Sequence, residues 1–348
     1  GTITIPKAYG GLEASNETLV QVFAIISAAD PSLGQIPQNH FALIQNLKDI
    51  GTESQKQRWF KAVLQGARLG NGGPEKKGKA AVITDITAHL ARAADGRLRV
   101  SGTRFYSTGA LFAHWIPFRA ADQQGRGVQV WVRRDAPGVQ VIDDWNAFGQ
   151  RTTASGSVVF DQVLVEEDHV LESWRFVDKP SLSGPISQLI QASIDAGIAQ
   201  GALQDALEFV RNRARPWTDS GVASATQDPH IIQEVGALQI EVDAAQEVLL
   251  EAARLLDELA ARPVDADSSA RASVAVAEAK ILTTEAALNA SEQLFALAGS
   301  SSTRAAHNLD RHWRNARVHT LHDPVRWKYH LLGNYLLNGA SPSYHQWN

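Results

Sequence analysis

The sequence predicts an α+β protein in which one β-rich region lies between two helical regions. Helical periodicity dominates residues 1–69, alternating apolar and polar runs with closely spaced turns fill residues 70–172, and long amphipathic patterns fill residues 173–348. With 348 residues the chain can bury a core in each region. We therefore expect an N-terminal helical domain, a middle antiparallel β-sandwich or barrel, and a C-terminal four-helix bundle.

The N-terminal region should contain three helices after a short extended segment at residues 2–12. The first helix is expected to begin at Asn16 and the second near His40. The third should follow Thr52, because Thr52 and Gln55 have the spacing of a capping box, in which each side chain binds the other residue's backbone N–H.

The middle region is expected to consist of short strands joined by tight turns. Asp95-Gly96 separates two alternating runs within residues 80–110, and such a dipeptide is a strong hairpin signal. The further expected strands are VQVWVRR, VQVIDDW and SVVFDQVLV, with turns at Pro137-Gly138 and Ser155-Gly156.

The C-terminal region contains three long amphipathic patterns that predict antiparallel helices. Asp228-Pro229 should open the second helix and Asp267-Ser268-Ser269 the third, since Asp and Ser accept hydrogen bonds from the first N–H groups of a helix. The terminal segment is then expected to supply the fourth helix of the bundle.

Composition excludes several classes of protein. A net charge of −4 provides no basic field for nucleic acid or an anionic membrane, and the absence of Cys excludes disulfides and thiolate sites. No apolar run is long enough to span a bilayer, and no signal peptide is visible. These features favour a cytoplasmic enzyme without a nucleic-acid or membrane partner.

The stretch Asp310–Lys328 gathers basic and histidine side chains just after the last long helical pattern. His319 and His322 lie three positions apart, so they share a face if the segment is helical. Histidine exchanges protons near neutral pH, which suits catalysis. The alternative is a basic, solvated helix end favoured by the helix dipole. These residues alone do not choose between the two.

Three local motifs, IPKAYGGL, GTRFYSTGA and FGQRTTASGSVVFDQVLV, connect the chain to a known family. Together with the helical–β–helical order they resemble the acyl-CoA dehydrogenase superfamily over essentially the whole chain. The resemblance implies the acyl-CoA dehydrogenase fold, with a further helical stretch before the opening segment, so that the N-terminal domain is truncated here.

Five segments resemble one branch, the reduced-flavin-dependent monooxygenases of sulfur acquisition, which are dibenzothiophene monooxygenase-like. The branch implies an enzyme that uses O2, through a C4a-hydroperoxyflavin, to oxygenate an organosulfur substrate. QIPQNHF at residues 35–41 looks more like members that act on alkyl sulfur compounds. The five segments are Gly70-Asn71, YSTGA at 106–110, DDWNAFGQRTTASG at 143–156, RPWTDSG at 215–221 and DRHWRNARVHTLHDP at 310–324.

The resemblance also implies catalytic roles. Ser107 would hydrogen-bond the flavin near N5, and Asn71 would donate to the peroxide or substrate oxygen. His322 would hold or deliver the peroxide proton, and His319 would bind the flavin or orient its neighbour. Judged by itself, Asn71 among glycines is typical of a turn and Ser107 of a strand.

Aromatic and polar side chains are implied to line the flavin and substrate sites. Trp145 would form an apolar wall for both, and Phe148 would approach the substrate. Without the resemblance Trp145 and Phe105 are typical core aromatics, and His40, implied to line the substrate pocket, could instead cap a helix. The remaining implied contacts are Phe105 and Tyr106 for the flavin and Asn39 for the substrate.

FMN, bound as FMNH2, is expected in preference to FAD. FAD-binding relatives carry a glycine-rich loop after the third bundle helix, whereas here Gly299 is followed by hydroxyl residues, which suit a phosphate. Arg215 is implied to bind the flavin phosphate through its planar guanidinium. Arg211 and Arg213 are alternatives for that role.

A separate NAD(P)H:flavin reductase is expected to supply the reduced flavin, because no G-x-G-x-x-G lies between a strand and a helix. The family implies a homotetramer, and the histidines lack the spacing of a metal-ligand set. Alternatives are an N- or aromatic-ring hydroxylase, a flavin-free partner-binding protein and an acyl-CoA dehydrogenase. The last is disfavoured because Asp323, followed by Pro324, stands where many dehydrogenases carry a longer catalytic Glu.

Overall fold

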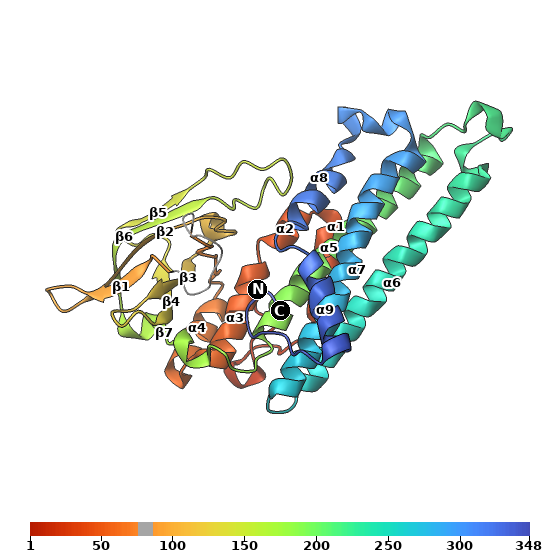
Figure 1. The fold of residues 1–348 in the computed structure, drawn as a ribbon. Helices are drawn as coiled ribbons and strands as arrows, with labels where there is room; N and C mark the ends of the chain where they lie inside the picture. Colours follow the sequence, from red (N-terminus) through yellow and green to blue (C-terminus); the bar gives the residue numbers. More distant parts are fainter. Residues whose placement is uncertain (76–85) are drawn as a thin grey trace. The chain divides into compact units, whose positions relative to one another are not determined.

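The computed structural model describes residues 1–75 and 86–348 (Figure 1). Contacts between residues divide the chain into two compact units, here called the sheet unit and the helical unit. The helix that begins at Asn16 groups with the C-terminal helices, whereas the domain boundaries at residues 69 and 172 stay a prediction. The sheet unit comprises Gly1–Ser15, Gln35–Asn146 and Arg151–Lys179, and the helical unit comprises Asn16–Gly34, Ala147–Gln150 and Pro180–Asn348.

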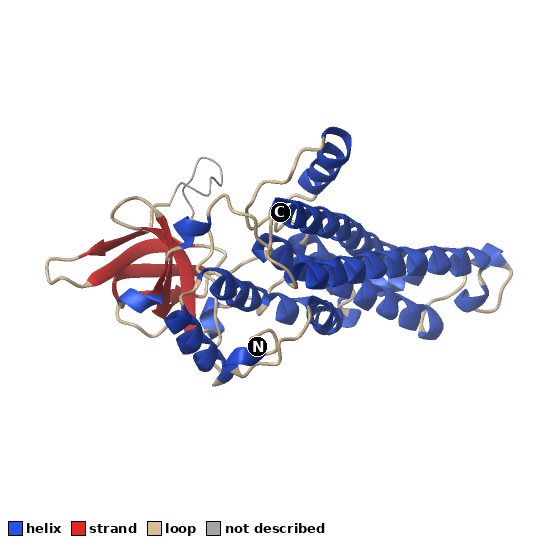
Figure 2. Cartoon of the chain, turned by 90° about the horizontal axis from the view of Figure 1, so that it is seen from below, coloured by secondary structure: helices blue, strands red, loops and turns tan. Residues whose placement is uncertain are grey.

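One seven-stranded sheet forms the centre of the sheet unit (Figure 2). The strand order is β5-β6-β2-β1-β3-β4-β7, and every neighbouring pair is antiparallel except β1 and β3. The predicted β domain is confirmed, and its sheet is mixed instead of purely antiparallel. The strands are β1 (His89–Arg92), β2 (Leu98–Arg104), β3 (Trp115–Ala121), β4 (Gly127–Arg133), β5 (Val139–Ile142), β6 (Ser157–Val165) and β7 (Val170–Leu171).

The predicted hairpin at Asp95-Gly96 is confirmed, because it joins β1 to β2 in an antiparallel register that pairs Arg92 with Leu98. Gly96 has a φ of 78°, in the left-handed region where a residue without Cβ is favoured. The first part of the run predicted from residue 80 lies outside the described residues, and the strand itself begins at His89.

Two helices of the sheet unit, α3 (Gln38–Ile50) and α4 (Glu53–Leu64), pack their apolar side chains into a core shared with β4. Trp59 of α4 lies 4.6 Å from Trp131 of β4, measured between ring centroids, and both rings are buried. Burying two such large aromatic side chains holds α4 against the sheet.

The capping box predicted for α4 is confirmed. Thr52 accepts a hydrogen bond from the Gln55 N–H, and the Gln55 side chain accepts one from the Thr52 N–H. The expected extended segment at residues 2–12 is wrong, since turns and a short 3-10 helix at Lys7–Tyr9 occupy it. Pro6 precedes that turn and Gly10, with a φ of 88°, ends it.

Three long helices dominate the helical unit: α5 (Ser183–Asn212), α6 (Pro229–Ala260) and α7 (Ala266–Ala298). Helix α1 (Asn16–Ala29) packs against α5 and α6. The terminal segment forms two shorter helices that pack against α7 and not the single fourth helix that was expected. These are α8 (Asp310–His319) and α9 (Arg326–Asn338), and the short α2 (Pro31–Gln35) follows α1.

The starts of α6 and α7 depend on Asp side chains. Asp228 caps α6 by accepting from the His230 N–H, as predicted. Helix α7 begins at Ala266, earlier than predicted, because Asp265, two positions before Asp267, forms a capping box with Ser268. The same residue types therefore cap the helix in a different register.

Helices α1 and α5 approach closely where α5 carries glycine. A Cβ added to Gly197 would lie 2.5 Å from the Ala24 carbonyl oxygen, and one added to Gly201 would lie 2.5 Å from the Ala28 carbonyl oxygen. These glycines are one helical turn apart, so they open one continuous groove for α1.

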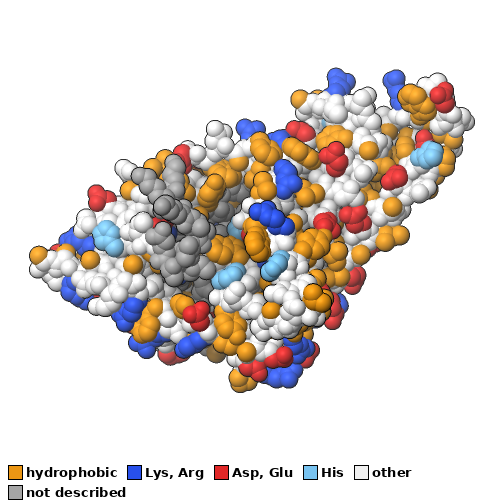
Figure 3. Space-filling view, viewed as in Figure 1, with side chains coloured by type: hydrophobic (Ala, Val, Ile, Leu, Met, Phe, Trp, Pro, Cys, Tyr) orange, Lys and Arg blue, Asp and Glu red, His pale blue; other side chains and the backbone are white. Residues whose placement is uncertain are grey.

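Charged side chains of both signs are interspersed over the face shown in Figure 3, in keeping with the net charge of −4. Within the described ranges, no helix combines the length and the apolar character needed to cross a membrane.

Candidate functional site

The candidate residues fall in both units, and each group is described within its own unit. In the sheet unit, Ser107 and Asn71 belong to neighbouring segments. The Asn71 N–H donates to the Thr108 carbonyl at 3.1 Å, and the Gly73 N–H donates to Ser107 Oγ at 3.3 Å. A Cβ on Gly73 would lie 2.0 Å from the Phe105 carbonyl oxygen, so only glycine permits this approach.

Ser107 is buried, with 1% of its surface exposed. Its Oγ accepts from Gly73, and among residues 1–75 and 86–348 no acceptor is found for its own hydroxyl proton. A buried hydroxyl of this kind can donate to a ligand, since unused donors are costly to bury. Two more buried hydroxyls lie beside it, because Ser155 is 2.7 Å from Thr108 Oγ1 and 2.8 Å from Thr153 Oγ1.

Tyr106 and Trp145 form an aromatic pair in the same unit. Their ring centroids are 6.0 Å apart and the planes meet at 75°, an edge-to-face contact. The Tyr106 ring is 62% exposed, and its backbone φ of 48° is unusual for a residue with a side chain. Such local strain is commonest at ligand sites. The structure thus brings Asn71, Ser107 and Phe105 together, with Tyr106 against Trp145.

His40 is buried on α3, and backbone groups contact both of its ring nitrogens. Nδ1 accepts from the Leu69 N–H at 3.1 Å, so Nε2 carries the proton and donates to the Gly1 carbonyl at 2.7 Å. Burial lowers the pKa of His40 to about 4, so the ring is neutral at pH 7. These contacts tie α3 to backbone groups outside the helix, and Asn39 beside His40 is only partly buried.

In the helical unit, His319 lies at the end of α8 in a buried polar network. Its Nδ1 is 2.5 Å from Asp195 Oδ1, and its Nε2 is 2.8 Å from Gln191 Oε1. Because an ionised carboxylate only accepts, His319 Nδ1 carries a proton. Burial lowers the pKa of the ring, Asp195 raises it, and nearby Lys280 lowers it.

Asp195 of α5 lies between Lys280 and His319. Lys280 of α7 donates to Asp195 Oδ2 at 2.6 Å, and the Thr284 hydroxyl donates to the same oxygen at 3.0 Å. Burial alone would raise the pKa of Asp195, but Lys280 and His319 hold it well below its usual range. The carboxylate is therefore ionised although it is fully buried.

His322 follows α8 and is linked to His319 by the Gln191 side chain. Gln191 Nε2 lies 3.4 Å from His322 Nε2, and Asp323 Oδ1 lies 3.2 Å from His322 Nδ1. Burial alone would raise the pKa of Asp323, but the hydrogen bond from His322 and neighbouring cations lower it to about 2. An ionised Asp323 assigns the His322 proton to Nδ1, which leaves Nε2 able to accept one.

The remaining predicted residues of the helical unit lie apart from this network. Phe148 stacks on Trp313, with ring centroids 5.9 Å apart, and its carbonyl accepts from Arg314. Arg213 and Arg215 are exposed after the end of α5 and Arg211 is exposed in its last turn, so exposure does not distinguish the three. Gly299 ends α7 with a φ of 74° and accepts from the Ser302 hydroxyl.

Sequence reasoning missed Asp195, Lys280 and Gln191. A signal was present, because Gln188, Gln191 and Asp195 recur at helical spacing within the otherwise apolar α5, and all three are buried. Lys280 likewise interrupts an Ala-rich stretch of α7. Polar residues on the core face of a helix require partners, although the periodicity does not say which.

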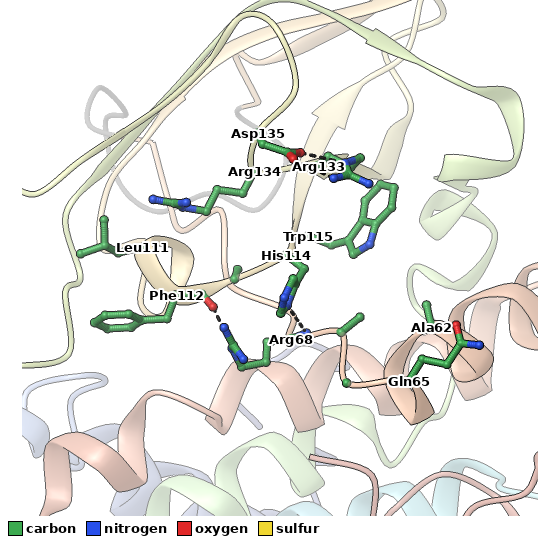
Figure 4. Close-up of a pocket in the computed structure, with 13 residues that line it drawn as sticks. Ala62, Gln65, Arg68, Leu111, Phe112, His114, Trp115, Arg133, Arg134 and Asp135 are labelled. Carbon is green, nitrogen blue, oxygen red and sulfur yellow. Dashed lines mark hydrogen bonds and ion pairs between the residues drawn. The ribbon is translucent and has the colours of Figure 1, made fainter.

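A pocket of about 630 Å³ lies elsewhere in the sheet unit (Figure 4). Arg68 Nε donates to the Phe112 carbonyl, and His114 Nδ1 accepts from the Arg68 N–H. Arg133 pairs with Asp135 through two contacts of 2.7 Å. None of the predicted site residues lines this pocket, and its charged side chains are exposed.

Among the described residues, Glu166, Asp168 and His169 bring three possible metal ligands within 4.8 Å of one another. Arg58 pairs with both Glu166 and Asp168, so a guanidinium already balances the two carboxylates. The group was not anticipated from the sequence. The Arg58 guanidinium already supplies the positive charge that a metal ion would bring.

The mixed sheet unit and the helical unit match the acyl-CoA dehydrogenase fold. Residues 1–67 match the acyl-CoA dehydrogenase N-terminal domain, and residues 189–327 match the acyl-CoA dehydrogenase C-terminal domain. The chain belongs to the acyl-CoA dehydrogenase family.

Similar proteins lie in the monooxygenase branch, which confirms that resemblance. Dibenzothiophene monooxygenase of Rhodococcus erythropolis is 34% identical, over 98% of this chain and 85% of that protein. The structure of TdsC from Paenibacillus sp. A11-2 with FMN and indole is 32% identical, with a TM-score of 0.94 over 100% of this chain and 90% of that one. Methanesulfinate monooxygenase MsuC of Pseudomonas fluorescens is 29% identical, with a TM-score of 0.92 over 100% and 89%.

Proposed function

We propose that this protein is an FMNH2-dependent monooxygenase that uses O2, through a flavin C4a-hydroperoxide, to oxygenate an organosulfur compound. The observation that carries the proposal is the pair His319 and His322, joined by buried Gln191, in a chain whose relatives are monooxygenases. One oxygen atom of O2 would bond to sulfur and the other would leave as water, with two electrons from FMNH2.

Reduced FMN, when bound, supplies those electrons and activates O2. The sheet unit offers groups that fit an isoalloxazine ring: the buried Ser107 hydroxyl that can donate, and the aromatic pair of exposed Tyr106 and half-buried Trp145. FMN in the structure of TdsC supports this choice over FAD. Phe105 and Asn71 would complete the contacts on this side, and Arg215 and Gly299 would bind the phosphate.

His322 is proposed as the residue that exchanges a proton with the reacting oxygen. Its Nδ1 donates to the ionised Asp323, so its Nε2 can take up a proton and return it. His319 would then orient its neighbours, since its ring nitrogens are engaged by Asp195 and Gln191. Asn71 would donate to the oxygen through its amide.

The substrate is proposed to be a small organosulfur compound. A dibenzothiophene and a methanesulfinate enzyme are both among the relatives, so the class is organosulfur over a range of sizes. Trp145, Phe148, His40 and Asn39 are proposed to line its site. The reduced flavin would come from a separate NAD(P)H:flavin reductase, and the assembly would be a homotetramer, which light scattering tests directly.

The test is a stopped-flow experiment in which anaerobic protein with FMNH2 is mixed with buffer containing ¹⁸O2. Delayed return of oxidised-flavin absorbance, together with one ¹⁸O atom in the product of an added sulfide or sulfinate, supports the proposal. His322→Gln should slow oxygenation on the order of 100-fold, whereas the exposed His330→Gln serves as the matched control. Return of oxidised flavin at the rate of free FMNH2 contradicts the proposal, and flavin reduction by acyl-CoA would establish the dehydrogenase alternative.

A further inference from the structure

Asp195 of α5 and Lys280 of α7 form an ion pair in the interior of the helical unit. Asp195 and Lys280 are each no more than 1% exposed, and both lie on core faces of their helices. A buried ion pair is weak support for stability, because losing water costs each ion much of what the attraction returns. Two apolar side chains of similar size would hold α5 and α7 together equally well.

The two carboxylate oxygens of Asp195 accept hydrogen bonds from different partners. Lys280 and Thr284 both donate to Oδ2, at 2.6 and 3.0 Å. Oδ1 is left for His319 Nδ1 at 2.5 Å. This division keeps the carboxylate ionised and turned so that Oδ1 faces the ring. By orienting Asp195, Lys280 places a proton on Nδ1 of His319.

The orientation of the His319 ring in turn fixes the side chain of Gln191. With Nδ1 of His319 donating to Asp195, its Nε2 faces Gln191 Oε1, 2.8 Å away, and because an amide oxygen only accepts, Nε2 is the donor of this hydrogen bond. The oxygen of the Gln191 amide is engaged there, so its nitrogen is directed at His322 Nε2, 3.4 Å away. Gln191 is fully buried, which limits other arrangements of its amide.

We propose that Asp195 and Lys280 are positioning residues for His322. They act through His319, whose Nδ1 they keep protonated, and through Gln191, which His319 aligns. The catalytic consequence rests on the proposed function, whereas the proton on His319 Nδ1 is a property of the polypeptide alone. The two parts can therefore be tested separately.

Two matched double variants separate positioning from support of the fold. Lys280→Met with Asp195→Asn removes both charges and keeps an oxygen that can accept from His319. Lys280→Met with Asp195→Leu removes both charges and that oxygen as well. Neither variant leaves a buried charge unpaired, so both are expected to unfold at similar urea concentrations.

The first readout needs no flavin. In protein labelled with ¹⁵N-histidine, long-range ¹H–¹⁵N spectra report which ring nitrogen carries a proton, and His319→Gln assigns the signals. We expect a proton on His319 Nδ1 in the wild type and in the Asn variant, and a mixture of tautomers in the Leu variant. His319 protonated only on Nε2 in the wild type, or identical spectra of the two variants, would overturn the proposal.

The second readout is the fraction of FMNH2 that ends as hydrogen peroxide and not as oxygenated product. We expect the Leu variant to raise that fraction several-fold over the Asn variant, with the substrate KM unchanged. Equal fractions in the two variants would contradict the catalytic part. If the wild type oxygenates no sulfur compound, the proposed function fails, and the spectra still decide the role of Asp195 and Lys280.

Discussion

The ammonium nitrogen of Lys280 lies 2.6 Å from Asp195 Oδ2, and solvent reaches neither group. The other charged contacts of α5 differ, since Asp205 pairs with Arg311 and His312 where its side chain is 27% exposed. Water can replace a lost partner at Asp205 but not at Asp195. The two acidic residues of one helix are therefore expected to respond very differently to loss of a cation.

Replacing Lys280 with Met should lower the free energy of unfolding by about 3–5 kcal/mol, because it leaves the Asp195 carboxylate buried without its main cation. Urea unfolding followed by circular dichroism measures the change. The double variant Lys280→Met/Asp195→Leu should recover most of the loss, and Arg311→Met should cost less than about 1 kcal/mol. A single-variant cost below about 1 kcal/mol would show that Asp195 is not held as an ion.

Stability should fall as the pH drops from 6.5 toward 4, partly because of His40. The pKa of its ring is about 4 in the folded chain, against 6.5 for an exposed histidine, so in this window the unfolded state binds a proton that the folded state does not. The contribution is at most about 1.4 kcal/mol per pH unit.

The measurement is urea unfolding at several pH values for the wild type and for His40→Gln. Gln has no charge to gain and can keep both hydrogen bonds, so the variant should show a shallower slope between pH 6.5 and 4. Parallel slopes would mean that His40 takes up its proton in the folded state.

Removing the hydroxyl of Ser107 should weaken FMN binding about fivefold, the effect of one neutral hydrogen bond. Quenching of FMN fluorescence on titration with Ser107→Ala measures the change. Ser101→Ala, on strand β2 just before Ser107 in the chain and with its hydroxyl engaged by Gln162, is the control and should bind FMN as the wild type does. Equal affinities of the two variants would remove Ser107 from the flavin contacts.

Adding a methyl group to Gly197 should destabilise the helical unit by about 1–3 kcal/mol, because the new Cβ would lie 2.5 Å from the Ala24 carbonyl and force α1 away from α5. Gly236 is the matched control. It is exposed within α6 and has no atom within 4 Å of the added Cβ, so Gly236→Ala should stabilise by roughly 0.5–1 kcal/mol. Thermal unfolding should move in opposite directions for the two variants, and a shift in the same direction would contradict the close helix contact.

Local interactions could be predicted because both partners lie within a few residues of each other. Thr52 and Gln55 cap α4 from three positions apart, and Asp228 caps α6 from immediately before its first turn. The hairpin at Asp95-Gly96 is equally local. Two acidic residues near the start of α7 could cap the helix. The sequence pattern favoured Asp267, whereas Asp265 is the residue that forms a capping box with Ser268.

The family resemblance and the candidate histidines were also available from the chain itself, since they rest on motifs that are contiguous in sequence. His319 and His322 stand three positions apart, and their shared face follows from helical geometry. The residues that these histidines contact cannot be predicted in this way, because periodicity describes one helix at a time.

Only the tertiary structure decided the partners of the buried charges. Asp195 is 85 positions from Lys280 and 124 positions from His319, and no local rule relates residues at such separations. The same holds for the grouping of α1 with α5 and for the parallel pairing of β1 with β3. A charge on an apolar helix face indicates that a partner must exist, because burying it alone is too costly, but packing of the whole unit selects which residue that partner is.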